Sequence, residues 1–355
     1  MDSHRDVRMD AGELLAFAAA MFKAAGLGDA DAGVMADSLV GADLRGTHSH
    51  GLIRLPFLVA RLRDGGANRQ ARIKVVREAP GTALLDGDRA LGAITATRAM
   101  EMAVAKARTQ GIGFVAATNS DFIGACAHYA MQALPHDMIG VAWTNGFPGM
   151  APWGGRRNTI GNNPIAFAAP SGSHGPVVLD MALSVAAGGR IRLAAKRKEH
   201  IPKGWVLGPD GEPTDDPADL AAGGALLPLG YKGYGLAVFG EILCGVLTGS
   251  NILGEVPAWF TDTDRAIGNG HMHMAIDIAR FIEVAQFKRR VDLLFEMLKA
   301  TPRVPGVEDI LLPGERAWRT HQAQLVEGIP VPRAVADDLL TLADRLGVPA
   351  PMALS

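Results

Sequence analysis

Apolar side chains recur at helical spacing in the first part of the chain. Over residues 10–25 this spacing predicts a helix that ends at Gly26, where a left-handed cap costs little. A second helix is predicted over about 29–45 and a third over about 52–63. The same pattern predicts further helices near 91–109, 233–248, 281–299 and 333–346.

From about residue 72 the pattern changes to short apolar runs separated by Gly, Pro and Asn. Strands are predicted in RIKVV, TALLD, GIGFVAAT, MIGVAWTN, PIAFAAP and PVVLDMA, and over 271–277. Residues 202–229 are rich in Pro, Gly and Asp and predict a long irregular segment of the kind that lines enzyme sites. The mixture predicts an α/β fold, in two interleaved domains rather than one.

Charge and cysteine content narrow the class of protein. Lys and Arg number 35 against 37 Asp and Glu, so the net charge suggests neither nucleic acid nor an anionic membrane as partner. No apolar run approaches the roughly 20 residues of a membrane span, and no export signal is visible. Cys126 and Cys244 lack metal-site spacing and are interpreted as reduced core thiols. We expect a soluble cytoplasmic protein with a small-molecule partner.

Residues 45–51, RGTHSHG, place two imidazoles and a hydroxyl between two glycines, in a turn between two predicted helices. Histidine titrates near neutral pH, and a hydroxyl such as that of Ser49 can relay a proton. Arg54 follows closely, and its guanidinium can hold a carboxylate by two hydrogen bonds. The pattern predicts proton transfer by His50 beside an anion clamp, and the structural alternative is a loop histidine bonded to backbone.

A catalytic histidine also needs a carboxylate to orient it. Asp180 follows the apolar run 177–179, where a strand would deliver a buried carboxylate at its carboxyl end. On sequence alone a strand-end cap is an equally good interpretation of this residue.

Paired histidines also raise the possibility of a metal-dependent hydrolase. His48 and His50 are two residues apart, as are His271 and His273, a spacing that can place two ligands on one face of a strand. The first pair falls in a turn, however, and no Asp or Glu ligand accompanies either pair. We therefore expect no metal, and interpret His271 and His273 as strand residues that pack or cap a sheet edge.

No strand is followed by the G-x-G-x-x-G pattern, so a Rossmann domain is not supported. A nicotinamide cofactor could still be bound by backbone amides and a lysine in Pro228–Gly235, which precedes a helix. A flexible glycine-rich connection is the alternative there. The basic run Arg190–Lys198 is interpreted first as a solvated helix face, and otherwise as a contact for a 2′-phosphate.

Several long segments together resemble the type-2 malate/L-lactate dehydrogenase family, which also includes sulfolactate and ureidoglycolate dehydrogenases and reductases of diketogulonate and cyclic imino acids. The likeness extends nearly from end to end. It rests on ADLRGTHSHGLIR, WTN, GNNPIAFAAP, VLDMALS, IPKGWVLGPDGEPTDDP, PLGYKGYGLAVFGEIL and LLPGER.

The resemblance implies an NAD- or NADP-dependent oxidoreductase that interconverts a small 2-hydroxy acid and a 2-oxo acid, or reduces a cyclic imino acid. By position, Ser49, His50 and Asp180 match the family's proton relay, with His50 as the proton donor. Arg54 would hold the substrate carboxylate, and His48 would lie in the same pocket. The positions that match cofactor-binding segments are Gly146, Asp180, Met181, Ala182, Lys232, Gly314, Glu315 and Arg316.

The resemblance also implies a non-Rossmann, sulfolactate dehydrogenase-like fold in a homodimer. A helical, dimerising domain would comprise residues 1–72, 233–260 and 300–355. A mixed-sheet α/β domain that binds NAD(P) would comprise residues 73–232 and 261–299.

Two positions depart from the family pattern. Phe122 stands where the family commonly has a second active-site histidine, and Arg190 stands where a lysine is usual. Phe122 makes one pocket wall apolar, so we expect a substrate with a less polar tail than malate or ureidoglycolate. The departure also leaves open a protein that binds a carboxylate without turning it over.

Overall fold

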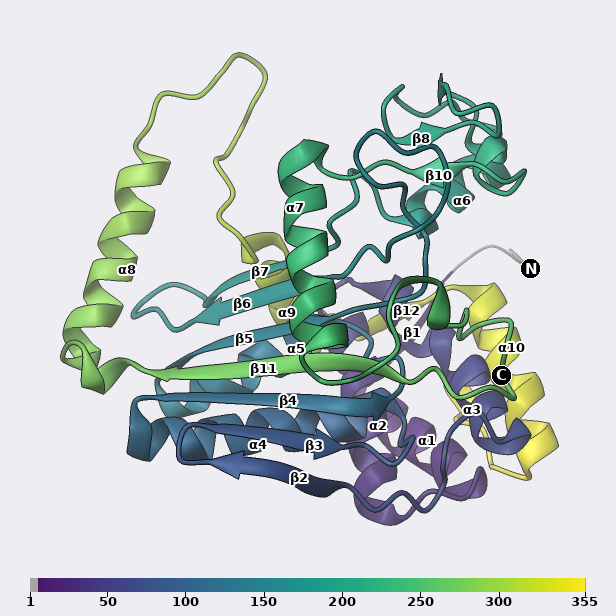
Figure 1. The fold of residues 1–355 in the computed structure, drawn as a ribbon, viewed down its shortest axis with the longest axis horizontal. Coiled ribbons are helices and arrows are strands. Elements are labelled where there is room, and N and C mark those ends of the chain that lie inside the picture. Colours follow the sequence, from purple (N-terminus) through teal and green to yellow (C-terminus); the bar gives the residue numbers. More distant parts are fainter. Residues whose placement is uncertain (1–5, 355) are drawn as a thin grey trace.

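The computed structural model describes residues 6–354 and is built around a seven-stranded mixed sheet. The strand order is β2-β3-β4-β11-β5-β6-β7, and β3 and β4 are its parallel pair (Figure 1). The strands are β2 (Lys74–Ala79), β3 (Thr82–Asp86), β4 (Ile112–Ser120), β5 (Met138–Thr144), β6 (Ile165–Ala169), β7 (Val177–Met181) and β11 (Asn269–Asp277). All seven fall within predicted strand segments or a few residues from them.

Helices cover both faces of this sheet. On one face lie α4 (Gly92–Gln110) and α5 (Cys126–Ala130), and on the other lies α7 (Gly230–Gly240), which continues as a π-helix over Glu241–Val246 (Figure 1). Because side chains alternate along a strand, Met272 of β11 packs on the α7 side while His271 and His273 point to the α4 side. α7 and the π-helix together correspond to the helix predicted over 233–248.

Small residues let α4 and α5 approach the sheet closely. A Cβ on Gly113 would lie 2.0 Å from the carbonyl oxygen of Ala103, and a Cβ on Gly140 would lie 2.0 Å from that of Ala130. The buried face of α4 is built largely from alanine. Close helix–sheet contact thus explains why so much of the apolar content of this chain is alanine.

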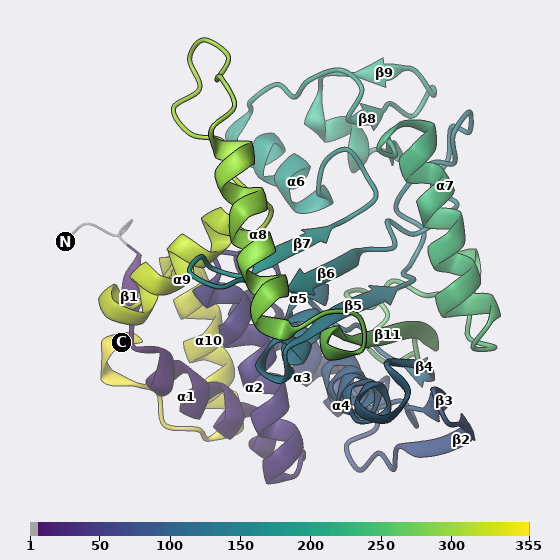
Figure 2. The same ribbon diagram turned by 90° about the vertical axis from the view of Figure 1, so that its left-hand side faces the viewer.

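A helical layer beside the sheet is assembled from both ends of the chain. Its helices are α1 (Ala11–Ala24), α2 (Asp29–Leu44), α3 (Leu55–Asp64), α9 (Glu315–Glu327) and α10 (Arg333–Leu346). The two ends are joined where β1 (Val7–Met9) pairs with β12 (Ile329–Val331) (Figure 1), and Figure 2 shows α1, α9 and α10 together at the left of the molecule. The expected architecture, a mixed sheet with a helical part from both chain ends, is confirmed.

The remaining elements extend from this body. They are α6 (Gly188–Arg197), β8 (Val206–Leu207), β9 (Pro213–Thr214), β10 (Ala225–Leu226) and α8 (Val284–Lys299). α8 stands away from the sheet at the left of the molecule in Figure 1. Within residues 6–354 no helix is both long and apolar enough to cross a membrane.

Two expectations about individual elements need correction. α9 was not among the helices predicted from the sequence. His271 and His273 lie on β11, which pairs with β4 on one side and β5 on the other. They therefore occupy the interior of the sheet and not its edge.

Candidate active site

Two 3₁₀ turns, His48–His50 and Leu52–Arg54, connect α2 to α3 as the sequence predicted. The buried carboxylate of Asp43 fixes their shape. Its Oδ2 accepts a hydrogen bond of 2.8 Å from the backbone N–H of Leu52, and its Oδ1 lies 2.8 Å from Nδ1 of His48. The hydrogen bond to Asp43 raises the pKa of His48, so this imidazole is tied to the turn by its own carboxylate.

His50 and Arg54 lie together at the outer side of this turn. The Oγ of Ser49 is 2.9 Å from Nδ1 of His50, and Nε of Arg54 donates a 2.6 Å hydrogen bond to the carbonyl of Ser49. Burial, with a smaller contribution from Arg54, lowers the pKa of His50 to about 4. Burial and then the nearby charge of Arg192 lower the pKa of Arg54 to about 10. The positive charges of Arg54 and Arg192 repel each other. An anion bound near them would relieve that repulsion.

An aromatic stack borders these two groups. The rings of His50 and Phe122 are stacked with centroids 6.0 Å apart, and those of Phe122 and Trp259 with centroids 4.2 Å apart. The guanidinium of Arg54 lies 5.1 Å from the centroid of Trp259. The structure thus places Phe122 beside the predicted acid. Sequence reasoning missed Trp259, which lies in a loop without periodicity, far along the chain from residues 48–54.

Asp180, the predicted partner of His50, lies on the edge strand β7. Its Oδ2 accepts a 3.0 Å hydrogen bond from the backbone N–H of Ala127. Partial desolvation raises the pKa of Asp180, while the Ala127 N–H and the charge of Arg45 oppose that rise. Among residues 6–354 no hydrogen bond or ion pair joins Asp180 to His50. The side chain is also exposed rather than buried, which corrects the sequence-based expectation.

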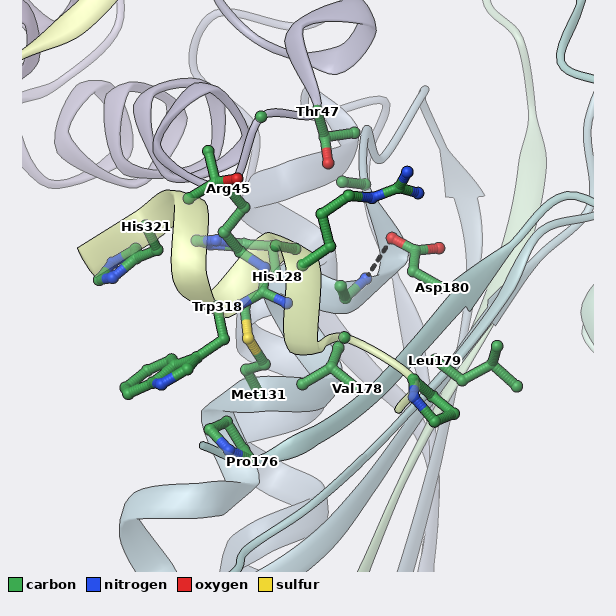
Figure 3. Close-up of a pocket in the computed structure, with 18 of the residues that line it drawn as sticks. Arg45, Thr47, His128, Met131, Pro176, Val178, Leu179, Asp180, Trp318 and His321 are labelled. Carbon is green, nitrogen blue, oxygen red and sulfur yellow. Dashed lines mark hydrogen bonds between the residues drawn. The ribbon is translucent and has the colours of Figure 1, made fainter. Parts of the chain in front are cut away.

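A cavity of about 830 Å³ lies where β7, α2, α5 and α9 meet (Figure 3). Asp180, Gly314 and Arg316, three of the predicted cofactor-binding residues, line it. Thr47, just before the turn His48–His50, and Ala125 of the loop after Phe122 are also on its wall. The cavity therefore reaches from the predicted cofactor segments to the two loops that carry His50 and Phe122.

The loop before α9 is fixed against β7. The backbone N–H of Val178 donates to the carbonyl of Pro313 over 3.0 Å, and a Cβ on Gly314 would lie 2.7 Å from the carbonyl oxygen of Val178. Glu315 does not line the cavity; its carboxylate instead accepts a hydrogen bond from the Leu312 N–H and pairs with Lys299 at 3.0 Å. Glu315 thus stabilises the loop that presents Gly314 and Arg316.

The other four predicted cofactor residues follow the ends of β5 and β7 or begin α7. Gly146 donates its N–H to Oδ1 of Asn163 over 3.1 Å. Leu183, next to Met181 and Ala182, accepts from the N–H of Leu229 over 2.9 Å, just before Lys232 in α7. Backbone contacts thus bring Met181, Ala182 and Lys232 to the same end of the sheet.

His271 and His273 form a buried pair. Nδ1 of His271 is 2.8 Å from Nε2 of His273, and Nε2 of His271 is 2.9 Å from Oγ of Ser120. Burial lowers the pKa of His271 to about 3, and burial also lowers the pKa of His273 well below its usual value. Across residues 6–354 there is no group of three or more His, Cys, Asp or Glu side chains placed to hold a metal ion.

This pair should make the fold sensitive to acid. Both imidazoles are neutral in the folded chain and titrate near 6.5 when unfolded, so stability is complete above that pH and is lost as the pH falls toward the folded pKa. Each group should lower the free energy of unfolding by about 1.4 kcal/mol per pH unit below about 6. Urea unfolding at several pH values should show a shallower slope for His271→Asn/His273→Leu than for the wild type, and equal slopes would contradict the assignment.

Comparison with known proteins identifies the family of this chain. The sequence profile of the family "Malate/L-lactate dehydrogenase" matches residues 9–340. The chain belongs to this family. The malate dehydrogenase of Pyrococcus horikoshii is 38% identical over 351 residues, 96% of each chain. A solved structure of that enzyme has a TM-score of 0.90 at 36% identity, covering 99% of this chain and 98% of the other.

The names of relatives in the family specify different cofactors, NAD(+) or NADP(+). A (2R)-3-sulfolactate dehydrogenase (NADP(+)) of Chromohalobacter salexigens is 35% identical and covers 96% of this chain and 98% of its own. A ureidoglycolate dehydrogenase (NAD(+)) of Escherichia coli is 33% identical, over 86% and 87% respectively. Family membership favours a dehydrogenase over the metal-dependent hydrolase that the paired histidines had suggested.

Proposed function

We propose that this protein is an NAD(P)-dependent oxidoreductase that interconverts a small 2-hydroxy acid and its 2-oxo acid. The observation that carries the proposal is the joint placement of His50 and Arg54 in one turn next to the cavity. A 2-oxo acid has its carboxylate one bond from its carbonyl, so neighbouring guanidinium and imidazole groups can engage both at once. The repulsion between Arg54 and Arg192 further suits an anionic ligand.

The cavity fits a nicotinamide cofactor. Its volume of about 830 Å³ is within the range of small-molecule sites, and the start of α9 with Arg316 provides positive potential for phosphate groups. Asp180, Gly314 and Arg316 would contact the cofactor from the wall, and Gly146, Met181, Ala182 and Lys232 from the adjoining end of the sheet. When bound, the cofactor supplies or accepts the hydride. Relatives of both NAD and NADP type leave either form open to this proposal.

The chain's own residues hold the substrate and move the proton. Arg54 binds the carboxylate, and His50 donates a proton to the carbonyl oxygen through Nε2, because Ser49 engages Nδ1. A carboxylate on Arg54 neutralises one of the two causes that lower the pKa of His50, so substrate binding favours the protonated donor. In this proposal Asp180 stabilises the imidazolium through its negative charge and not through a direct hydrogen bond.

A panel assay tests the proposal. The protein is mixed with NADH or NADPH and with 2-oxo acids or cyclic imines, with and without a chelator. Loss of reduced cofactor that is insensitive to the chelator supports the proposal. Hydrolysis that needs a metal and no cofactor, or ligand binding without turnover, would contradict it. Because Phe122 stacks on His50, comparable turnover of malate and pyruvate would contradict the expected apolar tail.

The proposal includes a homodimer. Several large apolar side chains of α7 and the π-helix are exposed, among them Phe239 at 62% and Val246 at 59%. A second copy would cover such a surface. Light scattering should give the dimer mass for the wild type and the monomer mass for Phe239→Asp/Val246→Asp. Val76→Asp, at an exposed apolar position on β2, serves as the control, and a dimeric double variant would contradict the assignment of this face.

The same proposal keeps the two-domain division and the cytoplasmic location expected from sequence. Although this division assigns residues 233–260 to the helical domain, α7 and the π-helix pack on the sheet of the α/β domain through Ala237 and Cys244. Both cysteines are free and buried, which suits a reducing compartment.

A further inference from the structure

Aromatic residues make up only 6% of the chain, yet five of them gather beside His50 and Arg54. They come from four segments far apart in sequence: α3, the loop after β4, the loop after β5 and the loop before β11. The five are Phe57, Phe122, Phe147, Trp259 and Phe260. Such a concentration requires that the loops be held accurately against one another.

One buried guanidinium holds two of these loops. Arg61 of α3 is fully buried, and its Nη2 lies 2.7 Å from Oδ2 of Asp121. Its Nη1 donates to the carbonyl oxygens of Trp259 at 3.3 Å and Asp262 at 3.0 Å, and its Nη2 donates to that of Arg265 at 2.9 Å. Arg61 thus binds the loop before β11 by three carbonyls and the loop after β4 by a carboxylate.

Asp121 also forms a hydrogen bond with the next residue in the chain. Its Oδ1 accepts a 2.7 Å hydrogen bond from the backbone N–H of Phe122. Arg61 therefore fixes the backbone on which Phe122 is mounted as well as that of Trp259. The stack then continues outward, from Trp259 to Arg54 by a cation–π contact and from Phe122 to His50 by ring stacking.

A buried ion pair of this kind needs a reason beyond stability. Removing two charges from water costs hydration free energy, and their mutual attraction offsets little more than that cost. Proteins in which apolar residues replace such a pair are often equally stable. The guanidinium is suited to this position because its planar fork can reach several acceptors in fixed directions, which a lysine cannot do. Here those acceptors belong to the two loops that flank the predicted proton donor and the anion clamp.

We propose that Arg61 and Trp259 are positioning residues: Arg61 aligns the stacked pair Phe122–Trp259, and Trp259 orients Arg54 for the substrate carboxylate. The inference rests on the proposed function, because it assumes that Arg54 binds the carboxylate. The inference predicts that substitutions in the stacked pair Phe122–Trp259 weaken substrate binding. Cofactor binding should not change, because the cavity lies on β7 and α9.

The test compares Trp259→Leu with Trp259→Phe. Loss of the cation–π face should raise the KM for the 2-oxo acid about tenfold, with kcat changed less and the KM for the cofactor unchanged. The phenylalanine variant should recover part of the loss, because it restores an aromatic face. Arg265→Gln is the matched control, since Arg61 contacts its carbonyl while its side chain is exposed.

Arg61→Lys should raise the same KM at least as much, because an ammonium cannot span both loops. If that variant fails to fold, the Trp259 variants still decide the matter. An unchanged substrate KM in Trp259→Leu, an equal rise in both KM values, or no recovery by phenylalanine would overturn the inference.

Binding of oxamate, a non-reducible analogue of a 2-oxo acid, separates this inference from the proposed function. Calorimetry should show weaker oxamate binding to Trp259→Leu than to the wild type. If the wild type binds oxamate and reduces no 2-oxo acid, the proposed function fails while the positioning role stands. If oxamate binds equally to both proteins, the positioning role fails whatever the activity.

Discussion

Replacing His50 by alanine should lower kcat for reduction of the 2-oxo acid by about 10²–10⁴-fold. The variant keeps Arg54 and the cavity on β7, so binding of substrate and cofactor should change little. The loss arises because neither neighbouring position supplies a second imidazole to take over the proton transfer. His48 is held by Asp43 at 2.8 Å, and Phe122 replaces the second histidine that the family commonly has at that position.

His200→Ala provides the matched control, because His200 lies on the surface with its side chain 83% exposed. It should retain wild-type activity. Cofactor binding to His50→Ala is followed by the fluorescence of the reduced nicotinamide. Activity near that of the wild type, with binding intact, would show that the proton donor has been misassigned.

Replacing Arg54 by methionine should have an effect of similar size on kcat/KM, through substrate binding. Removing one partner of a desolvated charge pair costs about 2–5 kcal/mol, which is roughly a 30- to 4,000-fold change. Arg54→Lys should recover only part of this loss, because an ammonium cannot form the two parallel hydrogen bonds of a guanidinium. Steady-state kinetics with the 2-oxo acid and the cofactor varied in turn locates the defect.

Arg63→Gln is the control for this series, since Arg63 is exposed in the last turn of α3, the helix that follows Arg54. An Arg54→Met variant with unchanged substrate KM and kcat would contradict the assignment of the clamp. A change confined to the KM of the cofactor would place Arg54 in the other half of the site.

The elements that carry the site were largely predictable from sequence. Helical spacing ending at glycine marked the turn that contains His48 and His50, and short apolar runs marked the strands of the sheet. These signals are local, because side-chain periodicity and turn formers act over a few residues. The resemblance to the family added the positions on β7 and near α9, and the family was confirmed.

Long-range contacts were beyond the reach of the same reasoning. Nothing local distinguishes Arg61 from a surface arginine, since its burial depends on Asp121 and on three carbonyls about two hundred positions away. Trp259 lies in an aperiodic loop. Asp180 lies in a predicted strand as expected, but its carboxylate faces the open cavity, which is formed by segments far apart in sequence. Strand order, which local sequence patterns do not determine, places His271 and His273 in the interior of the sheet.

The pH dependence of kcat/KM in both directions tests the central claim most directly. Because kcat/KM reports the free enzyme and the pKa of His50 is lowered to about 4, reduction should fall about tenfold per pH unit above that value. Oxidation of the 2-hydroxy acid needs neutral His50, so it should stay level down to about pH 5 and fall only below. Mirrored profiles that lose this group in His50→Ala are the predicted result. Profiles that run parallel in the two directions, or that His50→Ala leaves unchanged, would contradict His50 as the proton donor.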